Sequence, residues 1–227
     1  MGRLTKISCL CVTRRRVKLL QRSIECFRRQ TYNDRELLIV YESDDDETRL
    51  FRHAQTGSSE PVIRWIEIPA TPKLTLGELR NISVAQARGR YVCQWDDDDW
   101  YADQRLSEQF LALQKSGKPA IVLSRWIMSD GQSYWMSPTH TWEGSLLSRK
   151  SVMRPYAKLA VREDTPMIQE MQRSGLLAMM DAPFLYVYQC HGNNTWDSSH
   201  FAGLRALGHE LPEEQTRILH QQIAALQ

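Results

Sequence analysis

Short apolar runs alternate along the first half of the chain with segments in which apolar residues recur every three or four positions. The continuous runs predict buried strands at 6–13, 36–41, 62–68 and 91–95. The helical period predicts helices at 17–30, 76–88 and 103–115, and Gly89 is expected to cap the second of them. Strands that alternate with helices predict an α/β domain with a largely parallel sheet.

The second half of the chain gives shorter patterns. Apolar runs predict further strands at 120–123, 144–147 and 184–188. Thr165 and Pro166 predict the start of a helix that Gly175 ends, because proline favours the first helical position and Thr165 then serves as the cap. Near the end, Leu219, Ile223 and Leu226 form an apolar stripe, which predicts a helix docked on the domain.

Composition narrows the compartment and the partners. A length of 227 residues fits one large domain, and a net charge of +2 gives no general attraction to nucleic acid or anionic lipid. Apolar runs stay below the ~18 residues that span a bilayer, and the start resembles no secretion signal. Five cysteines without a Cys-x-x-Cys pair indicate a reducing compartment, with Cys9 and Cys11 as core residues. We therefore expect a cytoplasmic protein, either free or peripheral to a membrane.

Four consecutive aspartates, Asp96–Asp99, follow the predicted strand at 91–95 and stand between two tryptophans. Ligands of parallel sheets bind at the carboxyl ends of strands. Two carboxylates ~4 Å apart repel by about 4 kcal/mol at an effective dielectric constant near 20. Mg²⁺ or Mn²⁺ would offset this repulsion, since both accept oxygen ligands and leave positions for phosphates. The run therefore predicts a metal site, with a solvated acidic turn as the alternative.

Several segments together resemble glycosyltransferase family 2, which has the GT-A fold, a Rossmann-like mixed, mostly parallel sheet flanked by helices in one domain. The matching segments are 7–13, 36–48, 79–81, 87–92, the Asp-x-Asp motif at Asp96–Asp98 and the Glu163-Asp164 pair. The resemblance covers roughly residues 5 to 200. It implies a domain over 1–205, with a nucleotide-binding part at about 1–100 and an acceptor-binding part at about 101–205. Residues 206–227 would form the docked C-terminal helix.

The same resemblance implies a set of donor contacts. Thr13 and Glu42 would hold the base and ribose of a nucleotide sugar, and Arg80 would face the base or a phosphate. Asp96 and Asp97 would lie near the ribose and the metal, with Asp98 as direct ligand of Mn²⁺ or Mg²⁺.

Arg14 opens a run of three arginines that could contact the donor diphosphate. The sequence favours a solvated helix face for this run over a phosphate contact, and a site for a polyanionic acceptor such as modified nucleic acid or a lipid-linked phosphate is a further alternative.

Acceptor activation requires a base that removes the hydroxyl proton, and Asp164 is the candidate because Thr165 is expected to cap the helix. The helix N-terminus would lower the basicity of Asp164. Its neighbour Glu163 would position the acceptor. His191 could complete the metal shell or bond to backbone, and Trp142 could stack on an acceptor sugar or belong to the core.

These assignments predict a metal-dependent transfer from a nucleotide sugar, expected to be a UDP-sugar, to a hydroxyl of a glycan, a lipid-linked glycan or another acceptor. The resemblance to the family implies that the transfer proceeds with inversion. A nucleotidyltransferase is the rival enzyme, but residues 13–18 lack the glycines of a phosphate loop. A module of the same fold that binds sugars or nucleotides without turnover is the other alternative.

Overall fold

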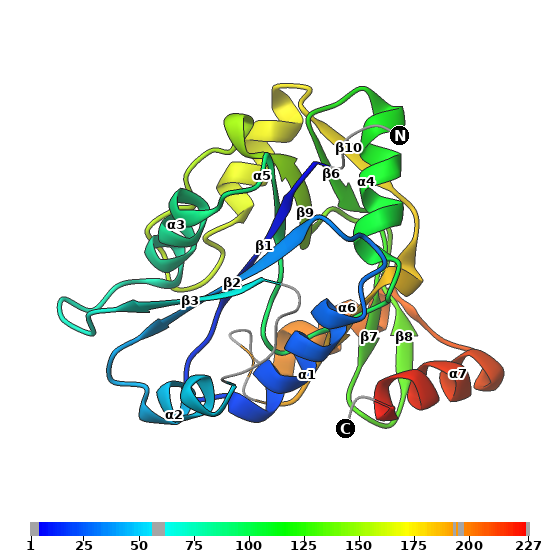
Figure 1. Cartoon of the computed structure of the whole chain (residues 1–227). Coiled ribbons are helices and arrows are strands. Elements are labelled where there is room, and N and C mark those ends of the chain that lie inside the picture. The colour runs from blue at the N-terminus through cyan, green and yellow to red at the C-terminus, as the bar shows by residue number, and fades with distance from the viewer. Residues whose placement is uncertain (1–4, 56–61, 193, 195–197, 226–227) are drawn as a thin grey trace.

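A seven-stranded sheet runs through the molecule, and helices cover both of its faces (Figure 1). The computed structural model describes residues 5–55, 62–192, 194 and 198–225. In spatial order the strands are β10 (Leu177–Met180), β6 (Ala120–Leu123), β9 (Trp142–Arg149), β4 (Tyr91–Gln94), β1 (Ile7–Val12), β2 (Arg35–Glu42) and β3 (Ile63–Ile68). β9 is antiparallel to both neighbours, and the other neighbouring strands are parallel. The predicted mixed, mostly parallel sheet is confirmed.

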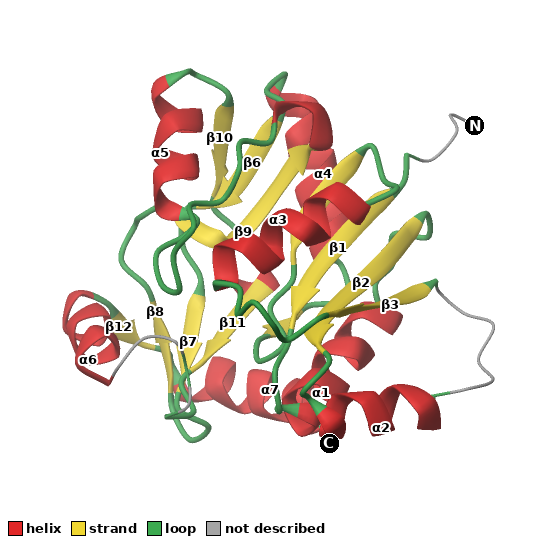
Figure 2. Cartoon of the chain, turned by 90° about the vertical axis from the view of Figure 1, so that its left-hand side faces the viewer, coloured by secondary structure: helices red, strands yellow, loops and turns green. Residues whose placement is uncertain are grey.

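Alternate residues of the central strands pack against different helix layers. One face carries α1 (Val17–Arg28) and α4 (Arg105–Ser116), and the other carries α3 (Leu76–Gln86) and α5 (Thr165–Arg173) (Figures 1 and 2). Cys9 and Cys11 are buried on the α1 side, whereas Leu10 between them packs with Val84 of α3. All five cysteines are free, and Cys9 and Cys11 are core residues as predicted.

A second, smaller sheet lies beside the carboxyl ends of the central strands. Its spatial order is β12 (His209–Glu210), β8 (Tyr134–Met136), β7 (Ile127–Ser129), β11 (Tyr186–Gln189) and β5 (Trp100–Tyr101). The remaining elements are α2 (Asp46–Ala54), α6 (Ser198–Leu207), α7 (Glu213–Ala224) and the short 3₁₀ helices η1 (Lys150–Val152) and η2 (Pro183–Leu185).

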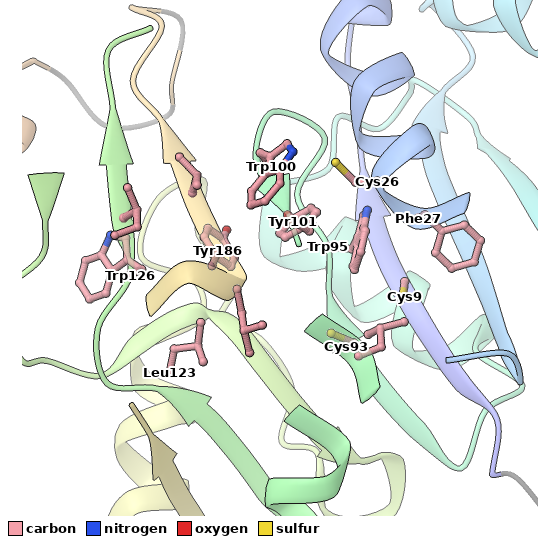
Figure 3. Close-up of a cluster of buried hydrophobic side chains, with 14 of the residues drawn as sticks. Cys9, Cys26, Phe27, Cys93, Trp95, Trp100, Tyr101, Leu123, Trp126 and Tyr186 are labelled. Carbon is pink, nitrogen blue, oxygen red and sulfur yellow. The ribbon is translucent and has the colours of Figure 1, made fainter. Parts of the chain in front are cut away.

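A line of aromatic rings joins the two sheets (Figure 3). Phe27 of α1 meets Trp95 edge to face at 6.0 Å, Trp95 lies 4.0 Å from Tyr101, and Tyr101 meets Tyr186 of β11 at 5.1 Å. The buried guanidinium of Arg105 lies 4.4–5.1 Å from the Trp95, Tyr101 and Tyr186 rings. Because these rings flank the turn at 96–99, they hold that turn between the sheets.

Two predicted helix boundaries are wrong. α3 ends at Gln86 with Ala87 in an extended conformation, so Gly89 does not cap it. Gly89 is instead required by close packing, because a Cβ there would lie 2.7 Å from the carbonyl oxygen of Lys6. At α5 the N-cap position is Asp164 and not Thr165, although the Asp164 side chain makes no capping hydrogen bond.

Elements missing from the prediction are α2, α6, β10 and most of the second sheet. The strand predicted at 184–188 is shortened, since η2 occupies its first residues. α7 buries Leu219 and Ile223 as the apolar stripe predicts, while Leu226 lies outside the described residues. The proposed boundary at 205 falls inside α6. Within the described ranges, no helix is long and apolar enough to cross a membrane.

Candidate functional site

A pocket of about 330 Å³ opens where β1 and β4 end and brings distant segments together. Its lining includes Asp96–Asp98 after β4, Arg80 from α3, Glu163 and Asp164 at the start of α5, and Trp142 at the start of β9. β1 and β4 are parallel neighbours, so their carboxyl ends share one edge of the sheet. The topology therefore explains why most of the predicted site residues share one pocket.

The first two aspartates of the run have different partners. Asp96 accepts hydrogen bonds from Arg80 Nη2 at 3.0 Å and from Gln94 Nε2 at 2.8 Å. Asp97 accepts from Thr13 Oγ1 at 2.6 Å and pairs with Arg16 at 3.0 Å. Burial raises the pKa of Asp97 to about 7, helped by the charge of Asp98 and opposed by Arg16 and the Thr13 hydrogen bond.

The last two aspartates face different parts of the molecule. Asp98 Oδ2 accepts from Arg16 Nη1 at 2.7 Å and lies 3.2 Å from Nε2 of His191. Burial works to raise the pKa of Asp98, but the His191 hydrogen bond and the Arg16 charge outweigh burial and lower it. Asp99 accepts hydrogen bonds from the Tyr186 hydroxyl and the Gln189 backbone, which ties the turn to β11.

The Asp98 and His191 pair fits a partial site for a divalent cation. Mn²⁺ accepts both carboxylate and imidazole ligands. Among the residues that the structure describes, no group of three His, Cys, Asp or Glu side chains is close enough to hold a metal. A cation held by one or two protein ligands completes its shell with substrate phosphates and water. The structure brings His191 to Asp98, whereas the Asp96 carboxylate is engaged by Arg80 and Gln94.

The other predicted donor residues lie beside the pocket. Glu42, at the end of β2, is buried and pairs with Arg14 and Lys73. Its Oε1 has no hydrogen-bond partner in the described part of the chain. Arg14 also makes a bidentate contact with Asp44 at 2.7 and 3.0 Å. Thr13 connects this cluster to the pocket, because it precedes Arg14 in the sequence and its hydroxyl donates a hydrogen bond to Asp97.

The arginine run is not the solvated helix face that the sequence favoured. Arg14–Arg16 precede α1, which begins at Val17, and Arg14 and Arg16 are paired with carboxylates. Arg16 bridges Asp97 and Asp98 across the pocket and is a site residue that the sequence left undistinguished from its neighbours. Its signal was the position just after the first strand, at the carboxyl edge of the sheet.

Arg80 connects the aspartate run to the candidate base. Its Nε donates to Glu163 Oε1 at 2.7 Å, and its Nη2 donates to Asp96. Burial raises the pKa of Asp164 to about 7, the Glu163 and Glu143 charges add to this, and Arg80 opposes it. Burial and the neighbouring carboxylates therefore outweigh the lowering of the Asp164 pKa that was expected from the helix N-terminus. A carboxylate with this pKa is half ionised near neutral pH, which suits a general base.

The loop that carries Glu163 and Asp164 is packed tightly on α3. Gly77 N donates to the carbonyl of Leu159 at 3.0 Å, and Ala157 N donates to the carbonyl of Glu163 at 2.9 Å. A Cβ at Gly77 would lie 1.8 Å from the Ala157 carbonyl oxygen, so only glycine permits this approach. Asn81, also on α3, exchanges two hydrogen bonds with the Tyr156 backbone. α3 therefore positions both Arg80 and the loop of the candidate base.

Trp142 lines the pocket and also packs in the interior. It stacks on Trp126 at 4.3 Å and meets Tyr188 edge to face at 5.2 Å. The sequence missed Trp126 and Tyr188, and also His140 and Glu143 of the same lining. Trp126 and His140 lie in loops, and Glu143 and Tyr188 lie in strands without a chemical motif, so only their spatial arrangement singles them out.

Comparisons with known proteins agree with this geometry. The sequence model of the protein family described as Glycosyl transferase family 2 matches residues 8–177, which is most of the chain. No curated protein matches the sequence.

Solved structures extend the comparison to the fold. S. aureus TarS, residues 1–349 in complex with UDP-GlcNAc, has a TM-score of 0.70 at 13% identity over 84% of this chain and 60% of that chain. The mannosyltransferase PcManGT from Pyrobaculum calidifontis, in complex with GDP-Man and Mn²⁺, has a TM-score of 0.63 at 12% identity. That match covers 86% of this chain and 59% of the other. The chain thus spans about 60% of the length of these structures, and the likeness confirms the predicted GT-A fold.

Proposed function

Because the chain belongs to glycosyl transferase family 2, we propose that this glycosyltransferase moves a sugar from a UDP-sugar to a hydroxyl of a glycan or another acceptor, with inversion. One observation carries the proposal: a single pocket is lined by Asp96–Asp98 and by Asp164. Inversion requires a donor group on one side of the reacting carbon and a base on the other. UDP-GlcNAc bound to TarS and GDP-Man bound to PcManGT support a nucleotide-sugar donor.

The donor end of the pocket would use both cations and carboxylates. Thr13 and Glu42 would hold the nucleoside, and Arg14 and Arg80 would face the diphosphate or base. Asp96 and Asp97 would bind near the ribose. A bound Mn²⁺ or Mg²⁺ would neutralise charge that grows on the leaving diphosphate, and Asp98 and His191 are the residues that would hold the cation. The Mn²⁺ in the PcManGT complex supports this cofactor.

At the acceptor end, Asp164 would take the proton from the attacking hydroxyl. As the hydroxyl oxygen bonds to the anomeric carbon, the bond from that carbon to the diphosphate oxygen breaks, and the proton passes to the carboxylate. The pKa of about 7 makes Asp164 a far better proton acceptor than an ordinary aspartate. Glu163, held by Arg80, would orient the acceptor, and Trp142 would pack against it.

A thermal-shift screen tests the donor site. UDP, GDP and their sugars are added with Mn²⁺, with Mg²⁺ or with EDTA, because a ligand that binds the native state raises its melting temperature. We expect a shift that needs the metal and is lost in Asp98→Asn. Asp181→Asn, which removes only a surface contact to Arg125, is the matched control. Absence of a metal-dependent shift with every nucleotide would refute the donor assignment.

Turnover separates the transferase from a binding module of the same fold. Release of UDP from the nucleotide sugar that gives the largest shift is followed with and without acceptor glycans. Binding without any release of UDP would favour the inactive module.

A further inference from the structure

The pocket has two chemically different walls. The first wall comes from the ends of β1 and β4 and from α3, and it carries Arg16, Arg80 and Asp96–Asp98. The second wall comes from the second sheet and the start of β9. It carries the aromatic residues Trp126, Trp142 and Tyr188, with the polar residues His140 and Glu143.

The aromatic part of the second wall is rigid. Trp126 is buried with 1% of its surface exposed, and it supports Trp142 by stacking with an interplanar angle of 17°. Tyr186 and Tyr188 meet the Trp142 ring edge to face at 5.7 and 5.2 Å. Gly144 leaves room for this ring, since a Cβ there would lie 3.3 Å from it. Trp142 and Tyr188 are only partly buried and border the cavity.

Two buried donors in this wall lack acceptors. The indole N–H groups of Trp126 and Trp142 have no hydrogen-bond partner among the described residues. A buried polar group without a partner is costly, so a ligand or water with acceptor oxygens is expected beside them.

The second wall carries one carboxyl group, that of Glu143, and Asp164 lies in the same pocket lining. Burial raises the pKa of Glu143, with the His140 charge working against it. Glu143 in turn raises the pKa of Asp164, so the two carboxyl groups interact through space. Arg80 is shared between Glu163 and Asp96, and Arg162 of the lining is already engaged within the protein. An anionic group placed here would therefore meet like charge.

We propose that the second wall is an acceptor subsite for an uncharged pyranose ring. This inference rests on the proposed transferase function and adds the class of acceptor. The apolar C–H face of the ring packs on Trp142 and Tyr188, while its hydroxyls reach Glu143 and His140. A ring that carries a carboxylate or a phosphate is disfavoured by Glu143 and Asp164.

Acceptor competition tests the subsite. UDP release from the nucleotide sugar identified by the donor screen is measured with methyl glucoside, methyl galactoside, methyl N-acetylglucosaminide, lactose, methyl glucuronide, glucose 6-phosphate and benzyl alcohol. We expect at least one neutral pyranoside to accelerate release, with kcat/KM at least tenfold above that of the glucuronide and the sugar phosphate. Trp142→Phe should raise the KM of that pyranoside at least fivefold. Trp65→Phe, which changes a β3 tryptophan packed on Tyr41 and Phe51, should not.

Glu143→Gln gives a readout that a structural role would not produce. Removal of one negative charge should lower the ratio of kcat/KM for the neutral sugar to kcat/KM for the glucuronide at least threefold. A preference for the charged sugars, or equal use of benzyl alcohol, overturns the inference. It is also overturned if no pyranoside is used although UDP binds with Mn²⁺. If UDP does not bind at all, the proposed function itself fails, and the acceptor subsite falls with it.

Discussion

Asp164 should impose a pH dependence on both activity and stability. Its pKa is about 7 instead of the usual 3.8, a difference of about 3 units caused by burial and by the neighbouring carboxylates. At ~1.4 kcal/mol per unit, ionisation of Asp164 costs the folded state at most about 4 kcal/mol. The side chain is partly exposed, so water screens this cost, and we expect about 1–2 kcal/mol in practice.

The sign of the stability effect follows from proton binding. The folded protein holds the Asp164 proton more tightly than the unfolded chain, so this group destabilises the fold as the pH rises from about 4 to about 7. Asp164→Asn removes the effect and should raise the free energy of unfolding above pH 7 relative to the parent, by about 1–2 kcal/mol. Urea unfolding at pH 5 and pH 8 measures the difference.

Activity should rise with pH over the range in which stability falls. A general base must be ionised, so kcat/KM should rise with pH to a plateau above about pH 7 and fall about tenfold per unit below it. Asp164→Asn should lower kcat by roughly 10²–10⁴. Initial rates of UDP release between pH 5.5 and 9 test this, with Asp181→Asn as control. A flat profile down to pH 5.5, or an Asn variant that keeps a tenth of the activity, would refute the assignment of the base.

Three further predictions concern other contacts. Gly77→Ala should lower the free energy of unfolding by roughly 2–3 kcal/mol because its Cβ meets the Ala157 carbonyl, while Gly203→Ala, with open space around it, should be neutral or stabilising in denaturant titrations. His191→Ala should weaken the apparent Mn²⁺ affinity about tenfold or more, read from Mn²⁺ titrations of the UDP-induced thermal shift, and an unchanged midpoint would exclude a ligand role. Arg16→Ala should lower the free energy of unfolding by about 1–3 kcal/mol in EDTA. Mn²⁺ should restore part of this loss, because the cation replaces the positive charge beside Asp97 and Asp98. An equal loss of stability with EDTA and with Mn²⁺ would contradict this.

Much of the central fold could be predicted because its signals are local and repeated. The strand predicted at 36–41 contains a continuous apolar run from Leu37 to Tyr41, which is typical of a protein interior, and this run is fully buried in β2. The helix at 17–30 shows three turns of apolar residues that pack on the sheet as α1. By contrast, β5 and β12 have two residues each, which is too short for any alternation to show.

The sequence placed candidate residues at the pocket where short motifs mark them, but it could not supply partners that come from elsewhere in the chain. Asp98 and Asp164 could be singled out from their neighbours in the sequence, and both line the pocket. The sequence could not reveal that Arg80 would link Asp96 to Glu163, because this depends on how the loop before α5 packs on α3. The raised pKa of Asp164 also depends on burial, which a linear pattern does not report.

The contact at Gly77 has a consequence for how the sequence of this protein can diverge. It is made between main-chain atoms, so the spacing between α3 and the loop of the candidate base tolerates neither a larger residue nor an inserted one. The turn that joins β7 to β8 is different, since no atom of the described residues beyond its chain neighbours lies within 4 Å of the Cβ position at Gly131. Insertions and deletions should therefore accumulate in that hairpin, while the spacing between α3 and the loop of Glu163 and Asp164 is kept.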